Sequence, residues 1–413
     1  MKNKLKKILL TLLLWLPSVV FSQTVNTGEL SITPGTQMST VGALDNKATG
    51  DVINDGELFV YSHYNNDGLV TFTSGRTSGI TRLKGIAGFQ DISGDMRMEW
   101  YNAEFNNSNV QPAFHLSNEV SIAGQAYFQQ GIVDNEAYSG LLVFENKASH
   151  LNVDDASHVD GLVRKNGNDA FRYPIGDKGK YRYASISNPN NTTDAFTGKY
   201  FFEDSNPLYP HTNKTTNITL IDNAEYWTID KTSATSDVFL TLSWNTATTP
   251  AAIYAAPTDE IHIVRWDSTS NSWIDEGGVA DTNAKEVTMV ANTLTQYGVF
   301  TLARVRANLV LEVFNAVSPN DDGLNDFFRI DGLAAHPNNI VTVFNRWGVL
   351  VFETKGYGNT ADSNVFKGLS DGRVTVDRNE RLPVGTYFYV IEAVNENEGT
   401  KTKKSGYLYI NEK

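Results

Sequence analysis

The chain has 413 residues, and its 34 Lys and Arg residues against 47 Asp and Glu residues give a formal net charge of −13 at pH 7. This acidic balance argues against nucleic acid and anionic membrane surfaces as partners, and the lack of cysteine excludes disulfides and thiol chemistry. The length allows two or three hydrophobic cores, while 11% aromatic residues and few helical periods indicate an all-β protein.

Residues 1–22 have the pattern of a cleavable secretory signal peptide. Four lysines precede an apolar stretch, Ile8–Leu16, and a short exit segment ends at Ser22. Cleavage there removes the four lysines and takes the net charge from −13 to about −17. No later segment approaches the roughly 20 apolar residues that a transmembrane helix needs. The sequence therefore predicts an exported chain without a membrane-spanning segment.

Residues 23–165 repeat a glycine-marked turn followed by a short strand. Asn26–Ile32 recurs as Asn54–Val60 and, more loosely, as Asn66–Phe72. A Gly turn before each brief strand is typical of the corner of a coil, so the repeat predicts a right-handed β-solenoid of about five to seven coils. The alternative is a β-sandwich with irregular hairpins, because the repeat is imperfect.

Three arginines mark the predicted junction between the first and second modules. Arg164, Arg172 and Arg182 flank the Pro174–Asp177 turn among several aromatic residues. The glycine spacing of a phosphate-binding loop is absent here, so we interpret the arginines as structural cations stacked on aromatic rings at a domain seam.

Residues 166–307 are predicted to form a β-sandwich. Four segments alternate at the strand period and are separated by polar loops: Glu225–Ile229, Val238–Trp244, Ile261–Trp266 and Tyr297–Leu302. The tryptophans of this region, Trp227, Trp244, Trp266 and Trp273, are expected to be core and rim residues, with a carbohydrate platform as the alternative.

Residues 308–413 contain four motifs in order. Phe314–Phe327 has a Pro-Asn-Asp-Asp-Gly turn between strands, and Ile340–Phe352 is predicted to be a hairpin around Arg346-Trp347-Gly348. Leu382–Ile391 enters a strand through a Pro-x-Gly turn, and Lys404–Ile410 is the closing strand. Such a set predicts a small immunoglobulin-like sandwich. The motif residues are Phe314, Ser318, Pro319, Asn320, Asp321, Asp322, Gly323, Asn325, Asp326, Asn345, Arg346, Trp347, Gly348, Pro383, Gly385, Thr386, Tyr387 and Gly406.

This motif set closely resembles the gliding motility-associated C-terminal domain, the type B sorting signal of the type IX secretion system. The sequence departs from the family at Phe366-Lys367-Gly368, where the family has Trp-Asp-Gly, and the segment from Gly368 to Leu382 is long. The resemblance implies export through the periplasm to the cell surface or medium. It also implies docking on an outer-membrane carrier of the type IX translocon, with a dedicated small outer-membrane barrel protein as a further candidate partner. We expect Trp347 and Tyr387 to be core anchors, and Asp322 and Arg346 to be exposed.

Catalytic patterns are absent from the sequence: there is no Gly-x-Ser-x-Gly elbow, His-Glu-x-x-His or Walker loop. A cluster of ligand-type residues could serve a metal or a hydrolase but is interpreted as solvated solenoid corners: His150, Asp154, Asp155, His158 and Asp160. We expect alanine at Asp154, Asp155 and His158 to leave folding unchanged. For the 320–326 loop, a side-chain-capped turn is favoured over a Ca²⁺ site, because no bidentate Glu follows at EF-hand spacing. No catalytic residue, metal or cofactor is therefore assigned.

Two function classes remain for the passenger region, residues 23–307. The favoured one is a non-enzymatic surface adhesin or structural component, which would contact a surface glycan or a host or substratum ligand. The alternative is a secreted polysaccharide lyase or hydrolase with a catalytic face on the β-helix, because such enzymes need only two or three carboxylates.

Overall fold

The computed structural model describes residues 23–257, 260–289, 294, 296–306, 311–333, 336–358, 364–371, 381–394 and 401–411. The predicted signal peptide, residues 1–22, lies outside these ranges. Strands dominate the described residues, so the predicted all-β class is confirmed. In the same ranges no helix is long and apolar enough to cross a membrane.

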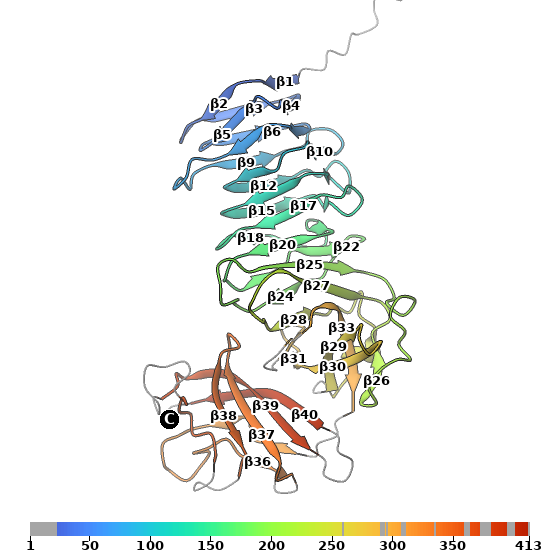
Figure 1. Ribbon diagram of the computed structural model, residues 1–413, viewed down its shortest axis with the longest axis vertical. Helices are drawn as coiled ribbons and strands as arrows, with labels where there is room; N and C mark the ends of the chain where they lie inside the picture. Colours follow the sequence, from blue (N-terminus) through green and yellow to red (C-terminus); the bar gives the residue numbers. More distant parts are fainter. Residues whose placement is uncertain are drawn as a thin grey trace, which may run out of the picture.

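Three parallel β-ladders form a solenoid of about six turns, which confirms the predicted solenoid (Figure 1). The first ladder consists of β1 (Gln23–Asn26), β4 (Ala43–Asn46), β7 (Tyr64–Asn66), β10 (Gln90–Ser93), β13 (Phe114–Leu116), β16 (Val133–Asp134), β19 (Val159–Asp160) and β22 (Ile175–Asp177). The second consists of β2 (Glu29–Ile32), β5 (Asp51–Asn54), β8 (Leu69–Thr71), β11 (Met98–Trp100), β14 (Glu119–Ile122), β17 (Leu141–Phe144) and β20 (Val163–Asn166). The third consists of β3 (Gln37–Thr40), β6 (Glu57–Val60), β9 (Ile80–Leu83), β12 (Asn102–Asn106), β15 (Gln125–Gln130) and β18 (Ser149–Leu151).

The repeated Asn and Gly residues form the corners of the coils. Asn26, Asn46 and Asn66 stack in register, and each of the first two donates from Nδ2 to the Oδ1 of the next at 2.8 Å. A Cβ at Gly68 would lie 2.3 Å from the carbonyl oxygen of Gly50, so the corner has no room for a side chain. The strands that follow alternate buried positions with more exposed ones, and the buried apolar side chains form one core along the solenoid.

In the second ladder, antiparallel pairing replaces parallel pairing after β20, and the second module begins there. The second ladder continues through β25 (Ala195–Phe201), β27 (Tyr226–Ser233), β33 (Gly298–Val305), β29 (Ile261–Asp267) and β30 (Ser272–Gly277), with β26 (Ile218–Ile221) paired to β33. A facing sheet consists of β21 (Phe171–Arg172), β24 (Ala184–Ile186), β28 (Leu240–Ser243), β32 (Glu286–Thr288) and β31 (Val279–Asp281). Two short elements complete the module, β23 (Lys180–Tyr181) paired to β22 and the helix α2 (Ala251–Tyr254).

The hydrophobic core runs without a break from Ile32 in the solenoid to Leu302 in the second module. Trp227 and Trp273 are fully buried and Trp244 nearly so, as expected for core residues. The first ladder also extends to β22, beyond the predicted joint near Lys165. The module boundary at residue 165 therefore remains a prediction, and both the sheets and the hydrophobic core continue across it.

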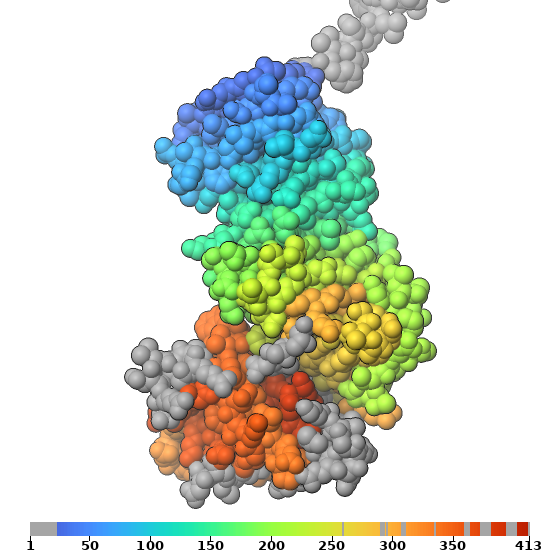
Figure 2. Space-filling view, in the orientation of Figure 1, coloured from blue at the N-terminus to red at the C-terminus, as the bar shows by residue number. Residues whose placement is uncertain are grey.

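The C-terminal module has a core of its own. Its five-stranded sheet has the order β35 (Ala316–Val317), β40 (Lys401–Ile410), β39 (Gly385–Val394), β37 (Asn339–Asn345) and β38 (Leu350–Lys355). β34 (Glu312–Val313) pairs with β36 (Ile330–Asp331). One face of the sheet packs on Phe328, Tyr357 and Phe366, and the other presents Phe344 and Val390 to the second module. The three parts follow one another along the long axis of the molecule (Figure 2).

Candidate functional site

The loop after β35 is held by hydrogen bonds from its own side chains. Asp322 accepts from the backbone N–H of Leu324 and from Asn320 Nδ2, both at 2.8 Å, and Asp326 accepts from the N–H of Gly323 at 2.8 Å. Asp321 and Asn325 adopt positive φ angles of 58° and 56°, which Asp and Asn tolerate better than most residues. The loop is closed at its base by the N–H of Ser318, which donates to the carbonyl of Asn325 at 2.7 Å.

This geometry is that of the side-chain-capped turn favoured by the sequence. Within the described ranges, no group of three or more His, Asp or Glu residues is arranged to hold a metal ion. Pro319 contacts the next motif segment, because a Cβ at Gly368 would lie 3.2 Å from its ring and Arg381 donates to its carbonyl at 3.0 Å. Most of the segment between Gly368 and Leu382 lies outside the described residues, but the N–H of Leu382 donates to the carbonyl of Gly368 at 2.9 Å.

The predicted hairpin turn is present between β37 and β38. Asn345 Oδ1 accepts from the N–H groups of Trp347 and Val349, at 3.0 and 2.9 Å, and the guanidinium of Arg346 lies 4.4 Å from the Trp347 ring. The expectation that Trp347 anchors the core is wrong: its side chain is 55% exposed at the tip of the turn. Gly348, in the same turn, packs closely against the second module. A Cβ at this position would lie 2.2 Å from the Phe239 ring, so there is no room for a side chain.

The remaining motif residues support the β39–β40 pair and the adjoining strands. Tyr387 is buried, as expected, and donates to the carbonyl of Pro383 at 2.8 Å. Gly406 lies opposite Tyr389, whose hydroxyl would be 2.3 Å from any Cβ at that position. Phe314 lies 4.7 Å from the guanidinium of Arg329.

Strand register brings most of these motifs to one end of the five-stranded sheet. Val317 pairs with Ile410, Ile410 pairs with Gly385, and Asn345 pairs with Tyr387. The 318–326 loop, the 345–348 turn and the 383–386 turn therefore leave the sheet at the same end, although they are far apart in the sequence. Pro383 and Thr386 are exposed there, as are Asp322 and Arg346, so this end offers one composite surface.

The His and Asp cluster of the solenoid does not converge on one point. His150 Nε2 lies 2.5 Å from the carbonyl of Arg172, and His158 Nδ1 lies 3.0 Å from the carbonyl of Asp154. Burial lowers the pKa of both histidines and favours the neutral ring. The interpretation of His158 as a solvated corner residue is wrong, because this side chain is fully buried, and we now expect its replacement by alanine to leave a cavity that destabilises the fold. Asp160 lies on β19, away from Asp154 and Asp155 in the turn that precedes it.

Asp154 and Asp155 instead line a groove of about 540 Å³ between the last solenoid turn and the second module. Its other walls come from Tyr181–Tyr183, from Ser243–Asn245 at the end of β28, and from Lys285 before β32. Asp155 Oδ1 accepts from the N–H of Tyr181 at 2.9 Å and lies 3.5 Å from the Arg182 guanidinium.

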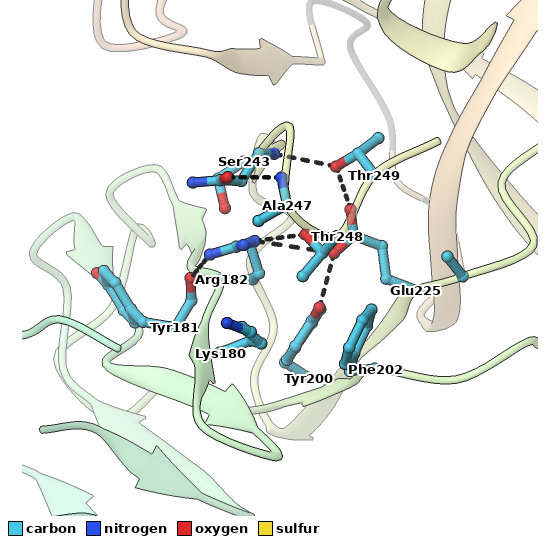
Figure 3. Close-up of polar contacts among 12 residues, drawn as sticks. Lys180, Tyr181, Arg182, Tyr200, Phe202, Glu225, Ser243, Ala247, Thr248 and Thr249 are labelled. Atoms are coloured by element: carbon cyan, nitrogen blue, oxygen red, sulfur yellow. Dashed lines mark hydrogen bonds and ion pairs between the residues drawn. The ribbon is translucent and has the colours of Figure 1, made fainter. Parts of the chain in front are cut away.

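Arg182, which lines the groove, also belongs to a buried polar network (Figure 3). Arg182 donates from Nε to Thr248 Oγ1 at 2.7 Å and from a terminal nitrogen to the carbonyl of Tyr181. Tyr200 donates to Glu225 Oε2 at 2.6 Å, and Thr249 donates to the other carboxylate oxygen. Burial raises the pKa of Glu225, although these hydrogen bonds and the charge of Arg182 act in the opposite direction. The network fixes the backbone on both sides of the groove.

Sequence reasoning missed this network and described the arginines only in part. Arg172 does stack on an aromatic ring, 3.9 Å from the centroid of Tyr183. The same expectation is wrong for Arg164, which pairs with Glu119 at 3.0 Å, and for Arg182, whose contacts are polar. The residues joined by the Arg182–Thr248, Tyr200–Glu225 and Thr249–Glu225 hydrogen bonds are 24 to 66 positions apart, so no local sequence pattern could predict these pairs.

Comparison with known proteins addresses the C-terminal module. None of the curated proteins matches the chain. Residues 311–410 match the family described as the CHU_C Type IX secretion signal domain. The match covers the loop, the turns and the paired strands that carry the motif residues, and it indicates export to the cell surface or extracellular space. The chain therefore carries a type IX secretion signal domain at residues 311–410.

Proposed function

We propose that this exported protein acts outside the cell as a non-enzymatic adhesin or structural component. The observation that supports this most directly is the continuous core from Ile32 to Leu302. Because the coils and the second module share sheets as well as a core, we expect the passenger to act as one elongated unit, and the stacked coils extend away from the signal domain (Figure 1). An elongated unit of this kind suits display or attachment at a distance from the point of export.

The residues that would suit catalysis have structural contacts instead. His150 and His158 each hydrogen-bond to a backbone carbonyl, and Asp154 Oδ1 accepts from the N–H of Ala156 at 2.8 Å. A glycoside hydrolase of the usual kind places two carboxylates on opposite sides of the scissile bond, and the two groove aspartates are sequence neighbours on one wall. This arrangement favours binding over cleavage.

We further propose that the composite end of the signal-domain sheet contacts an outer-membrane carrier of the type IX machinery. The proposal is supported by the exposure of Asp322, Arg346 and Thr386 at the sheet end where the motif turns meet. Because these turns come from distant parts of the sequence, the carrier would recognise the folded domain and not a linear peptide.

The test of the adhesin proposal compares binding with cleavage. Mature protein is applied to a glycan array, and the same preparation is incubated with polysaccharides in a reducing-sugar assay. We expect binding to at least one glycan, or to none if the role is structural, and no release of reducing ends. Release that is abolished in the Asp154→Asn, Asp155→Asn double variant would establish the enzyme alternative.

A further inference from the structure

The groove beside Asp154 has the size and composition of a small-molecule site. Its volume of about 540 Å³ lies within the range of about 300–1,000 Å³ that ligand pockets occupy. Tyr181 and Tyr183 contribute aromatic surface, and Asp154, Asp155 and Asn245 contribute hydrogen-bonding groups. These residues come from three segments that only the fold brings together.

Several polar groups that line the groove have donor or acceptor atoms that make no hydrogen bond within the described residues. Oδ1 of Asp154 caps Ala156, and Oδ2 has no partner among the described residues. Oδ2 of Asp155 has one distant neighbour, Lys180 Nζ at 3.9 Å. Asn245 uses its Oδ1 for the N–H of Ala247, while its Nδ2 has no hydrogen bond within the same described ranges. The groove thus offers carboxylate acceptors and an amide donor.

The groove carries charges of both signs, so it favours no strongly ionic ligand of either sign. Asp154 and Asp155 would repel an anion, and the Asp155 side chain is 53% exposed. A cation would face Lys180, Lys285 and the Arg182 guanidinium, which lies 3.5 Å from Asp155. Arg182 itself is too buried for contact with a ligand, since its side chain is only 4% exposed. A neutral, hydroxyl-rich ligand can use the acceptors and donors without either repulsion.

The groove is also held in shape before a ligand arrives. The Arg182–Thr248 bond and the Glu225 contacts of Tyr200 and Thr249 tie the Tyr181–Tyr183 wall to the loop that follows Asn245 (Figure 3). Trp227 adds a further tie, because its Nε1 donates to the carbonyl of Arg182 at 3.1 Å. A rigid wall lowers the ordering cost of binding.

We propose that this groove binds a neutral saccharide unit of a glycan. The sugar ring packs against Tyr181, hydroxyls donate to Asp154 and Asp155, and Asn245 Nδ2 donates to a sugar oxygen. Aromatic faces with adjacent carboxylate and amide groups suit a sugar, which has an apolar ring face and a polar edge. The inference deepens the proposed adhesin function, on which it rests, by assigning ligand contact to one site.

The test measures binding to the mature protein by isothermal titration calorimetry. Cellotetraose, mannotetraose and laminaritetraose serve as neutral probes, and trigalacturonate serves as the acidic probe. We expect at least one neutral probe to bind and the acidic probe to bind more weakly. Asp154→Asn keeps an oxygen for the Ala156 cap, and Tyr181→Ala removes the aromatic face; each should raise the Kd about tenfold.

Matched variants outside the groove are Asp51→Asn and Tyr138→Ala, which should leave the Kd unchanged. Thermal unfolding of each variant checks the fold, and Asp154→Asn decides the question if Tyr181→Ala is unstable. Failure of all neutral probes, tighter binding of trigalacturonate, or unchanged Kd in Asp154→Asn would overturn the groove assignment. If a neutral probe binds equally well to the groove variants, the groove assignment is wrong but the adhesin proposal is still supported. If a bound probe is cleaved, the adhesin proposal is wrong but the groove remains a ligand site.

Discussion

Asp160 on β19 lies among carboxylates that change its ionisation. Burial raises the pKa of Asp160 to about 7, and the charges of Asp177, Asp134 and Glu136 act in the same direction. In the unfolded chain this carboxyl has its ordinary pKa near 3.8. The folded protein therefore holds a proton that the unfolded chain has lost, so ionisation of Asp160 reduces stability as pH rises from about 4 to about 7.

Replacement of this carboxyl should remove that loss of stability. We expect Asp160→Asn to raise the unfolding midpoint above that of the wild type at pH 8, with a difference that shrinks as pH approaches 4. Thermal unfolding followed by circular dichroism across this range measures the effect, and the same change at exposed Asp51 is the control. A difference that is independent of pH would show that ionisation of Asp160 is not its cause.

Single residues also show where sequence patterns stop being informative. Tyr387 and Trp347 are both aromatic motif residues, yet one is buried on a strand and the other is exposed at a turn tip. Motif membership does not distinguish them, because burial depends on whether a residue follows strand alternation or lies in the turn. His158 is a similar case, since its burial comes from packing between neighbouring coils that the local sequence does not specify.

At the scale of elements, the asparagine stack is a structural device that local sequence does encode. Asn46 is fully buried and donates to Asn66 Oδ1 at 2.8 Å and to the carbonyl of Gly50 at 3.0 Å. We expect Asn46→Ala to destabilise the N-terminal coils by about 1–3 kcal/mol, because it removes the hydrogen bonds of this buried amide to both neighbouring asparagines and to the Gly50 carbonyl. Urea unfolding gives the change in free energy.

The control for the asparagine stack is Thr27→Ala, an exposed change at the same corner. Hydrogen exchange of β4 and β7 should increase in Asn46→Ala and remain as in the wild type in Thr27→Ala. Equal protection in the two variants would mean that the stack contributes nothing to coil stability.

The elements differ in how far sequence could predict them. The coil corners repeat Asn and Gly at visible spacing, and the hairpin around Asn345 has local turn chemistry, so both were predictable. The antiparallel extension of the second ladder was not, because β20 pairs with β25 and the pairing depends on contacts across 29 or more residues. The groove and its network depend on the same long-range pairing, which explains why their residues carried no pattern.

At the scale of the whole molecule, the signal domain is a separate unit that touches the passenger. Its core shares no residue with the passenger core. Contact is made by Phe344 and Val390 against Val279, with Phe239 nearby, and by Ser405, whose hydroxyl donates to the carbonyl of Gly278 at 2.8 Å. Passenger folding should therefore survive removal of the signal domain, although the removal exposes a small apolar patch.

This separation allows a direct test of export. We expect deletion of residues 309–413 to leave a folded passenger in the periplasm, because the segment that matches the type IX secretion signal is then missing. Fractionation of cells and medium gives the location of the chain, and protease resistance of the retained passenger shows whether it has folded. A retained but unfolded passenger would be a failure of folding and not of sorting.

A double change of Asp322→Ala and Arg346→Ala separates recognition from the presence of the domain. Both side chains are exposed at the shared end of the sheet, so the domain core should stay folded, although the loop loses the two hydrogen bonds that Asp322 accepts. Thermal unfolding of the purified variant checks that the domain is intact. If the carrier recognises this end of the folded sheet, the full-length double variant should accumulate in the periplasm, as expected for the variant that lacks residues 309–413. Normal export of the double variant would place recognition elsewhere on the domain, and normal export of the truncated chain would show that the domain is dispensable for secretion.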